Sequence, residues 1–322
     1  MAVGMRKSTT EDTENTEGKE GVRISDPETL SGPASVSVFS VLKTFGRMVK
    51  FSHTVFALPF ALAATALAAR GHGITIAQIV AILVAMAGAR TAAMGFNRIV
   101  DRRLDAKNPR TAGREIPTGK VSVLSAALLT AISAGAFIAA SASLGRLCLV
   151  LSPIVLGLVL GYSFTKHFTW LCHLFLGLAI GIAPAGAWLA VRGDLGAPAV
   201  WLVAAVTTWI GGFDILYALS DREFDRGAGI YSIPARFGVP AALVISAALH
   251  FGTGAALIAV GYSAGLGAIY FLGVTAVVAI FIYEHSIVRP SDLSRIDVAF
   301  FNLNGYVSLV YLLATLAQVI AG

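Results

Sequence analysis

Charged residues are scarce in this chain. Lysine, arginine, aspartate and glutamate make up 13% of the 322 residues, whereas hydrophobic residues make up 56%. A typical soluble domain carries about 25% charged residues, so this composition excludes an ordinary soluble protein. The chain also lacks the short segments of alternating polar and apolar residues that build a transmembrane β-barrel. An all-α, polytopic membrane protein is the class that fits.

Cysteine is scarce as well. Cys148 and Cys172 are the two cysteines, and each lies inside an apolar run. This placement predicts small core residues and excludes a disulfide framework. The net charge of +6 does not indicate nucleic-acid binding, because the basic residues lie in loops between apolar runs. Their distribution instead reports the orientation of the chain in a lipid bilayer.

Residues 1–38 lack the apolar core of a signal peptide. They are polar and of mixed charge, which predicts a disordered tail ahead of a transmembrane domain at 39–322. In that domain we expect about nine membrane-spanning helices, at residues 51–70, 75–97, 121–141, 146–164, 169–191, 197–219, 240–261, 265–288 and 298–321. Most basic residues follow the even-numbered helices, so the positive-inside rule places those loops on the cytoplasmic side. Helix glycines such as Gly177, Gly181 and Gly186 predict close helix packing.

Two stripes of oxygen-bearing side chains follow apolar helices. Asn97, Asp101 and Asp105 are spaced four residues apart, so on a helix they share one face. Asp221 and Asp225 have the same spacing. Carboxylates combined with substrate phosphates are the usual ligands of Mg²⁺ in proteins. The stripes therefore predict a divalent-cation site. The alternative, solvated helix ends paired with arginines, fits one stripe better than two.

The stripes belong to a weak internal repeat. Gly95-Phe96-Asn97 recurs as Gly212-Phe213-Asp214, and Ile116-Pro117 recurs as Ile233-Pro234. The two units lie four helices apart and are expected to have the same orientation in the membrane. Two parallel repeats of this kind would bring the carboxylate stripes face to face, so that one site gains ligands from both halves.

Basic and aromatic side chains accompany the stripes. Arg110 and Arg114 follow the first stripe, and Lys166 lies one helical turn after Tyr162. Cations beside carboxylates and Mg²⁺ are typical of a site that holds a polyanion. For the arginines, anchoring on the cytoplasmic side of the membrane is the alternative.

Charged and polar residues also occur inside the helices. Arg90 and Asp214 lie at matching depths, and together they predict either a pocket for a small acidic or phenolic group or a structural buried pair. His173 and His250 are expected to be core histidines, because neither has a neighbour at metal-ligand spacing. Glu284 lies near a helix end, where snorkelling toward the interface is expected.

Together the motifs resemble those of the UbiA superfamily of intramembrane prenyltransferases, which attach polyprenyl chains to aromatic or lipid acceptors. The matching motifs are Asn97-x-x-x-Asp101-x-x-x-Asp105, Tyr162-x-x-x-Lys166 and Asp221-x-x-x-Asp225. The resemblance runs from about residue 45 to the end of the chain. Nine helices around a lateral cavity agree with it.

The resemblance implies Mg²⁺-dependent transfer of a polyprenyl group from a polyprenyl diphosphate to an aromatic acceptor. The implied metal ligands are Asn97, Asp101, Asp105, Asp221 and Asp225, of which Asp101 and Asp221 are the expected catalytic aspartates. The residues implied to hold the diphosphate are Arg110, Arg114, Lys166 and Tyr162. Arg90 matches an arginine near the acceptor, and Asp214 matches a catalytic acidic residue that activates the acceptor.

Residues 50–60 and 107–114 look most like enzymes of quinone biosynthesis in bacterial inner membranes. Two acceptors stay open, namely 4-hydroxybenzoate for ubiquinone and the aromatic precursor of the futalosine route to menaquinone. Residues 169–173 and 300–302 favour the menaquinone relatives. The alternatives of a different class are a membrane transporter and another Mg²⁺-dependent membrane lipid transferase. The stripes lie at the membrane face rather than at the midplane, which counts against transport.

Overall fold

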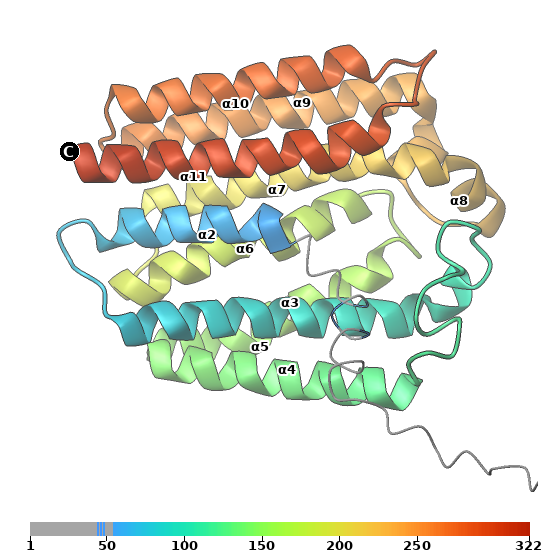
Figure 1. Cartoon of the computed structure of the whole chain (residues 1–322), viewed down its shortest axis with the longest axis horizontal. Helices are drawn as coiled ribbons and strands as arrows, with labels where there is room; N and C mark the ends of the chain where they lie inside the picture. Colours follow the sequence, from blue (N-terminus) through green and yellow to red (C-terminus); the bar gives the residue numbers. More distant parts are fainter. Residues whose placement is uncertain (1–43, 45, 47, 49–53) are drawn as a thin grey trace, which may run out of the picture. The chain divides into compact units, whose positions relative to one another are not determined.

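The computed structural model describes residues 54–322 together with residues 44, 46 and 48 (Figure 1). The tail predicted for residues 1–38 lies outside the described residues. The described part is helical, with a single isolated β-bridge between Arg289 and Asp292. Its segments are α2 (Thr54–Ala69), α3 (Ile76–Asp105), α4 (Val123–Leu144), α5 (Arg146–Thr165), α6 (Cys172–Arg192), α7 (Ala197–Ala218), η2 (Leu219–Asp221), α8 (Arg222–Ala228), α9 (Ile233–Ser263), α10 (Ala268–Ile287), η3 (Val298–Leu303) and α11 (Asn304–Ala321).

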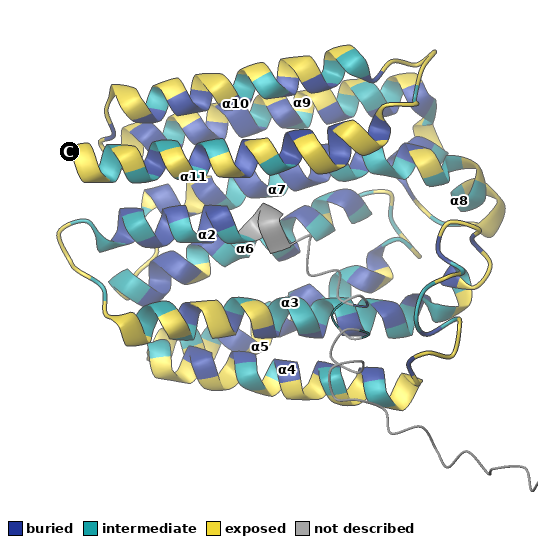
Figure 2. Ribbon diagram, in the orientation of Figure 1, coloured by how far each residue is buried: buried dark blue, intermediate teal, exposed yellow. Residues whose placement is uncertain are grey.

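The described helices match a polytopic membrane protein. Eight helical segments are long and apolar enough to cross a membrane, and α2 adds a shorter apolar helix. Figure 2 shows exposed residues along the outer faces of α4 and α10. Leu128 and Ile132 on α4 and Leu272 and Ile282 on α10 are among these exposed apolar residues. Such faces are stable against lipid tails, so the predicted all-α membrane class is confirmed.

Some helix boundaries agree with the prediction, whereas others, near the carboxylate stripes, differ from it. The separate helices predicted at 121–141 and 146–164 are confirmed as α4 and α5, because Gly145, with a φ of 136°, ends α4. α3 continues to Asp105 rather than ending near residue 97. α9 begins at Ile233, where the Ser232 hydroxyl accepts a hydrogen bond from a backbone N–H of the first turn. Gly238, with a φ of 81°, separates this first turn from the long body of α9.

α7 lies at the centre of the hydrophobic core. It packs against α6 on one side and α9 on another, and its residues Leu202, Val206 and Trp209 are fully buried. The Trp209 ring lies 4.9 Å from the ring of Phe60 on α2, which in turn stacks on Tyr311 of α11 at 4.5 Å. This aromatic chain buries large side chains at the point where α2, α7 and α11 meet.

Glycines set the distance between α6 and α7. A Cβ atom at Gly177 would lie 2.2 Å from the backbone oxygen of Thr207, and one at Gly181 would lie 2.6 Å from its hydroxyl. Close packing is therefore confirmed at these two positions. At Gly186 the prediction is wrong, because a Cβ there meets no atom within 4 Å.

Two polar residues inside the helices also depart from their predictions. Glu284 does not snorkel toward the interface, because its side chain is fully buried. His250 is buried as expected, yet Glu284 and His285 place possible ligand atoms within 4.8 Å of its ring. These neighbours come from α10, so the local sequence around His250 gave no sign of them.

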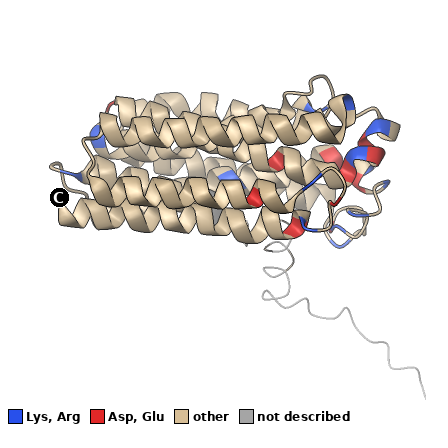
Figure 3. Cartoon of the chain, turned by 90° about the horizontal axis from the view of Figure 1, so that it is seen from above, with Lys and Arg blue, Asp and Glu red and all other residues tan. Residues whose placement is uncertain are grey.

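Carboxylates are concentrated toward one end of the bundle. Figure 3 shows most of the aspartate and glutamate residues toward the end that carries α8. The loop between α3 and α4 lies at this same end (Figure 1) and contributes basic residues to it. The cytoplasmic location of this end stays a prediction.

The close contact at Gly177 can be tested by the substitution Gly177→Ala, which adds a single methyl group. We expect Gly177→Ala to lower the free energy of unfolding by about 1–3 kcal/mol, because the new Cβ overlaps backbone of α7 that cannot move aside alone. Thermal unfolding of the detergent-purified protein measures the change. Gly186→Ala on the same helix is the matched control and should leave the midpoint unchanged or raise it. Equal midpoints for the two variants would contradict the packing argument.

Candidate active site

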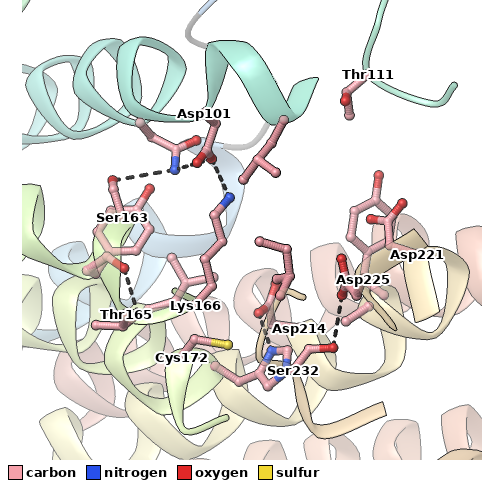
Figure 4. Close-up of a pocket in the computed structure, with 18 of the residues that line it drawn as sticks. Asp101, Thr111, Ser163, Thr165, Lys166, Cys172, Asp214, Asp221, Asp225 and Ser232 are labelled. Carbon is pink, nitrogen blue, oxygen red and sulfur yellow. Dashed lines mark hydrogen bonds and ion pairs between the residues drawn. The ribbon is translucent and has the colours of Figure 1, made fainter. Parts of the chain in front are cut away.

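A polar cavity of about 340 Å³ lies among α3, α5, α6, α7, α8 and the loop after α3. The residues that the sequence assigned to metal, diphosphate and acceptor all line it: Arg90, Asn97, Asp101, Asp105, Arg110, Arg114, Tyr162, Lys166, Asp214, Asp221 and Asp225. Figure 4 shows Asp101 on one side of this space and Asp221 and Asp225 on another, with Lys166 reaching toward Asp101. The fold therefore brings the two motifs to one place.

The first stripe lies on a continuous helix. Because α3 extends to Asp105, Asn97, Asp101 and Asp105 share one helix face, as their spacing predicts. The Asn97 amide donates a hydrogen bond to Asp101 Oδ2 over 3.0 Å. Asp101 and Asp105 are 3% and 5% exposed. Two carboxylates this deeply buried need partners, since an unpaired buried charge is strongly destabilising.

The second stripe is built differently from the first. α7 ends at Ala218, Asp221 closes the 3₁₀ turn η2, and Asp225 lies in the separate short helix α8. The expectation of two similar stripes at the ends of two long helices is thus corrected for the second one. Asp225 Oδ2 accepts a hydrogen bond of 2.9 Å from the Ser232 hydroxyl, which also caps α9. This contact fixes α8 to the start of α9.

Each predicted diphosphate-binding cation pairs with a different aspartate. Lys166 Nζ lies 2.6 Å from Asp101 Oδ2, and an Arg114 guanidinium nitrogen lies 2.6 Å from Asp105 Oδ1. Arg110 pairs with Asp221 through both of its carboxylate oxygens, a two-pronged geometry that suits the planar guanidinium. These pairs leave carboxylates and cations alternating around the cavity.

The pair of Arg110 and Asp221 is also held by residues that the sequence analysis missed. The Asn108 amide donates to Asp221 Oδ1 over 3.1 Å, and the Tyr217 hydroxyl accepts from Arg110 over 2.6 Å. The guanidinium lies over the Tyr217 ring, 4.8 Å from its centroid. Burial alone would lower the pKa of Arg110, but hydrogen bonds to Asp221 and its charge outweigh burial and raise the pKa above the usual value. Tyr217 lies four residues before Asp221, which is the signal that could have found it.

His173 is a further missed residue. It is buried, as predicted for a core histidine, but it lies in the cavity wall next to Asp214. Its Nε2 accepts a hydrogen bond of 3.2 Å from the backbone N–H of Ile233. The ring proton therefore lies on Nδ1, which donates to Asp214 Oδ2 over 2.6 Å. The hydrogen-bond partner of the Asp214 carboxylate is thus His173, which joins α6, α7 and α9.

Two carboxylate oxygens of the first stripe stay without partners. Among the described residues, Asp101 Oδ1 and Asp105 Oδ2 are buried and have no hydrogen-bond partner. Buried polar atoms in folded proteins are normally satisfied, so each exception calls for an ion or water. Carboxylate oxygens are the donors that Mg²⁺ prefers. The residues present therefore fit a divalent cation at the first stripe, on the side that lines the cavity.

Known proteins are similar to this chain in sequence. The model of the UbiA prenyltransferase family matches residues 57–306. The 4-hydroxybenzoate octaprenyltransferase of Vibrio parahaemolyticus is 33% identical over 229 residues, which cover 69% of this chain and 77% of that protein.

Solved structures agree with this relationship. An apo UbiA homologue from Aeropyrum pernix is 34% identical, with a TM-score of 0.75 over 82% of this chain and 97% of that one. A UbiA homologue from Archaeoglobus fulgidus bound to GPP and Mg²⁺ has the same fold, with a TM-score of 0.64 at 17% identity over 87% of this chain and 100% of that one. This chain belongs to the UbiA prenyltransferase family and is a membrane-embedded prenyltransferase.

Proposed function

We propose that this enzyme transfers a polyprenyl group from a polyprenyl diphosphate to an aromatic acceptor of quinone biosynthesis, in a reaction that requires Mg²⁺. The observation that carries the proposal is the cavity in which the aspartates of both motifs alternate with Arg110, Arg114 and Lys166. A site with both a cation-binding and an anion-binding side suits a metal–diphosphate substrate.

The carboxylates form the cation-binding side. Asn97, Asp101 and Asp105 would hold Mg²⁺ together with Asp221 and Asp225, and the unpartnered oxygens of Asp101 and Asp105 support this assignment. Bound Mg²⁺ supplies positive charge that stabilises the diphosphate as a leaving group. The UbiA homologue from Archaeoglobus fulgidus, which has the same fold and is bound to GPP and Mg²⁺, also supports it.

Arg110, Arg114 and Lys166 form the anion-binding side, with Tyr162 beside them. Each cation is already held near the cavity by its aspartate. As the bond between the allylic carbon and the diphosphate oxygen breaks, its electron pair leaves with the diphosphate. The three cations stabilise this growing negative charge, which is the kind of contribution that usually dominates such catalysis. The pairs with aspartate give way to pairs with phosphate oxygens.

The acceptor side of the cavity is formed by Arg90, Asp214 and His173. A carboxylate on the acceptor pairs with Arg90, which brings a guanidinium charge from α3 to the wall of this cavity. Asp214, held by the Nδ1–H of His173, attracts the phenolic proton and so enriches the aromatic ring in electrons. The activated ring carbon then forms the new bond to the allylic carbon, and the proton on that ring carbon passes to the released diphosphate, which restores the aromatic ring.

A second, largely apolar cavity suits the isoprenoid tail. It has a volume of about 260 Å³ and lies among α3, α4, α5 and α6. Met86 and Ala89 of α3 line it, and both lie within about one helical turn of Arg90, which lines the polar cavity. Apolar walls near the reacting carbon also keep water from attacking it.

The acceptor assay tests the proposal directly. Purified protein with Mg²⁺ and a radiolabelled polyprenyl diphosphate is given 4-hydroxybenzoate in one tube and 1,4-dihydroxy-6-naphthoate in another. Residues 169–173 and 300–302 favour the menaquinone relatives, but the relative from Vibrio parahaemolyticus is named for 4-hydroxybenzoate. We therefore expect a prenylated product from 4-hydroxybenzoate, and loss of product on addition of EDTA. Product from the naphthoate alone would move the enzyme to menaquinone synthesis. Flux into sealed vesicles without product or diphosphate release would instead favour a transporter.

The two aspartate motifs should be indispensable. We expect Asp101→Asn and Asp221→Asn to lower kcat roughly 10²–10³-fold or more. Each substitution removes a negative charge that holds the cations, Mg²⁺ included, that stabilise the departing diphosphate. Steady-state kinetics with the polyprenyl diphosphate measure the loss. Glu223→Gln is the matched control, because Glu223 lies on α8 between Asp221 and Asp225, with its side chain 77% exposed. Full activity in both aspartate variants would contradict the proposed site.

The apolar cavity should limit donor length. Gly186 lines this cavity and has open space at its Cβ position, so we expect Gly186→Phe to lower activity with long polyprenyl diphosphates while geranyl diphosphate is still used. Gly157→Phe on α5 is the matched control, since Gly157 also has open space but lies on the exposed face of its helix. An equal loss with short and long donors, or a selective loss in the control, would contradict the tail assignment.

A further inference from the structure

A second cluster of titratable side chains lies outside the active-site cavity. His250 on α9 is 2% exposed, Glu284 on α10 is 0% exposed, and His285 on α10 is half-buried. One ligand atom from each lies within 4.8 Å of the others. None of the three lines the polar cavity. Ionisable residues within a membrane-spanning bundle are costly, and their presence calls for a functional explanation.

The Glu284 carboxylate lacks a strong cationic partner. In the described part of the chain, its ion-pair partner is His250, with Nδ1 3.4 Å from Oε2, and no lysine or arginine pairs with it. Oε2 is buried and makes no hydrogen bond with any described residue. A carboxylate in this position must bind either a proton or a cation, because an uncompensated charge in a bundle of apolar helices is strongly destabilising.

Two of the three separations between the ligand atoms are close to those of a tetrahedral metal centre, and all three atoms lie within 4.8 Å of one another. Zn²⁺ binds histidine nitrogen and carboxylate oxygen at about 2.0–2.2 Å, which places neighbouring ligand atoms roughly 3.3–3.5 Å apart. His250 Nδ1 lies 3.0 Å from His285 Nε2 and 3.4 Å from Glu284 Oε2. Both distances are close to that value. Two histidines and one glutamate with a fourth position for water form a common donor set for Zn²⁺.

Surrounding hydrogen bonds orient two of the three ligands. The Nε2 of His250 faces the backbone oxygen of Trp209 at 3.3 Å, so Nε2 carries the ring proton and Nδ1 keeps its lone pair. The other oxygen of Glu284 accepts from Asn304 over 3.1 Å, and Asn304 accepts from the Trp209 indole over 2.6 Å. Metal-ligating histidines and carboxylates are typically held by such outer partners.

The His250 ring is also fixed by packing. It stacks on Phe281 with ring centroids 4.4 Å apart. A Cβ atom at Gly212 would lie 2.4 Å from the ring, so this glycine leaves room for it. The donor atoms therefore need little rearrangement to receive an ion.

We propose that His250, Glu284 and His285 bind a divalent transition-metal cation of the Zn²⁺ type, at a site separate from the cavity of the prenyl transfer. The bound ion neutralises Glu284 and ties α9 to α10, and through Asn304 and Trp209 it connects these helices to α11 and α7. Hydrogen bonding without metal is the competing explanation. It joins the two histidines, but a proton on Oε2 of Glu284 would find, among the described residues, His250 Nδ1 at 3.4 Å as its acceptor, which is too far for a strong O–H···N hydrogen bond.

Metal content of the full-length protein tests the site without any prenyl substrate. Protein purified in detergent and stripped with EDTA is dialysed against Zn²⁺ in the presence of excess Mg²⁺, which occupies the catalytic carboxylates. We expect one equivalent of Zn²⁺ per chain, a higher unfolding midpoint with Zn²⁺, and loss of both in His285→Ala and Glu284→Gln. His72→Ala is the matched control, because His72 is an exposed histidine in the loop between α2 and α3, and it should keep the bound metal.

A spectroscopic measurement on the unaltered protein covers the case in which a variant does not fold. Co²⁺ in place of Zn²⁺ should give the intense visible absorption of a four-coordinate ion, because geometry determines the spectrum. Absence of this absorption together with absence of bound Zn²⁺ overturns the proposal. Equal Zn²⁺ binding by the wild type, His285→Ala and Glu284→Gln also overturns it, since the ion would then lie elsewhere.

Discussion

Pairing between cavity cations and aspartates is the interaction on which the rest of the site depends. Lys166 reaches from the end of α5 to Asp101 on α3, and Arg110 reaches from the loop after α3 to Asp221 on η2. These charges are partly removed from water, so leaving either partner alone would be costly. The pairs therefore hold α3, α5, η2 and the intervening loop around one space. They also keep the cations where a polyanion needs them.

The two aspartate motifs have the same spacing but different backbones. The first follows a single face of α3, so its carboxylates are placed as rigidly as the helix itself. The second is interrupted at Asp221, and the chain turns into α8 before Asp225. Asp221 consequently faces Arg110 and Asn108, whereas Asp225 bonds Ser232. The two motifs are therefore similar in sequence but not in backbone structure or in the partners of their carboxylates. The cavity that they line is asymmetric as a result.

The sequence predicts those parts of the site that depend on local spacing. Asp101 and Asp105 are found because a helix places residues four apart on one face. His173 is not found, because its role depends on Asp214, 41 residues away, and on Ile233, 60 residues away. The exposure of Glu284 is mispredicted for the same reason. Its position near the end of a helix suggests an exposed side chain, but the side chain is buried and accepts a hydrogen bond from Asn304 of α11. The roles of His173 and Glu284 are determined by contacts between residues far apart in the sequence. The local spacing of residues contains no information about such contacts.

α7 connects the two polar regions of the bundle. Asp214 on this helix faces the cavity, while Trp209, five residues earlier, donates its indole N–H to Asn304 beside Glu284. Inside a bilayer these polar groups must find partners within the protein, since no water is there to replace them. A rotation of α7 that turned Asp214 away from His173 would also withdraw the Trp209 indole from Asn304. The direction of the Asp214 carboxylate is therefore fixed partly from outside the cavity, by hydrogen bonds that the membrane makes obligatory.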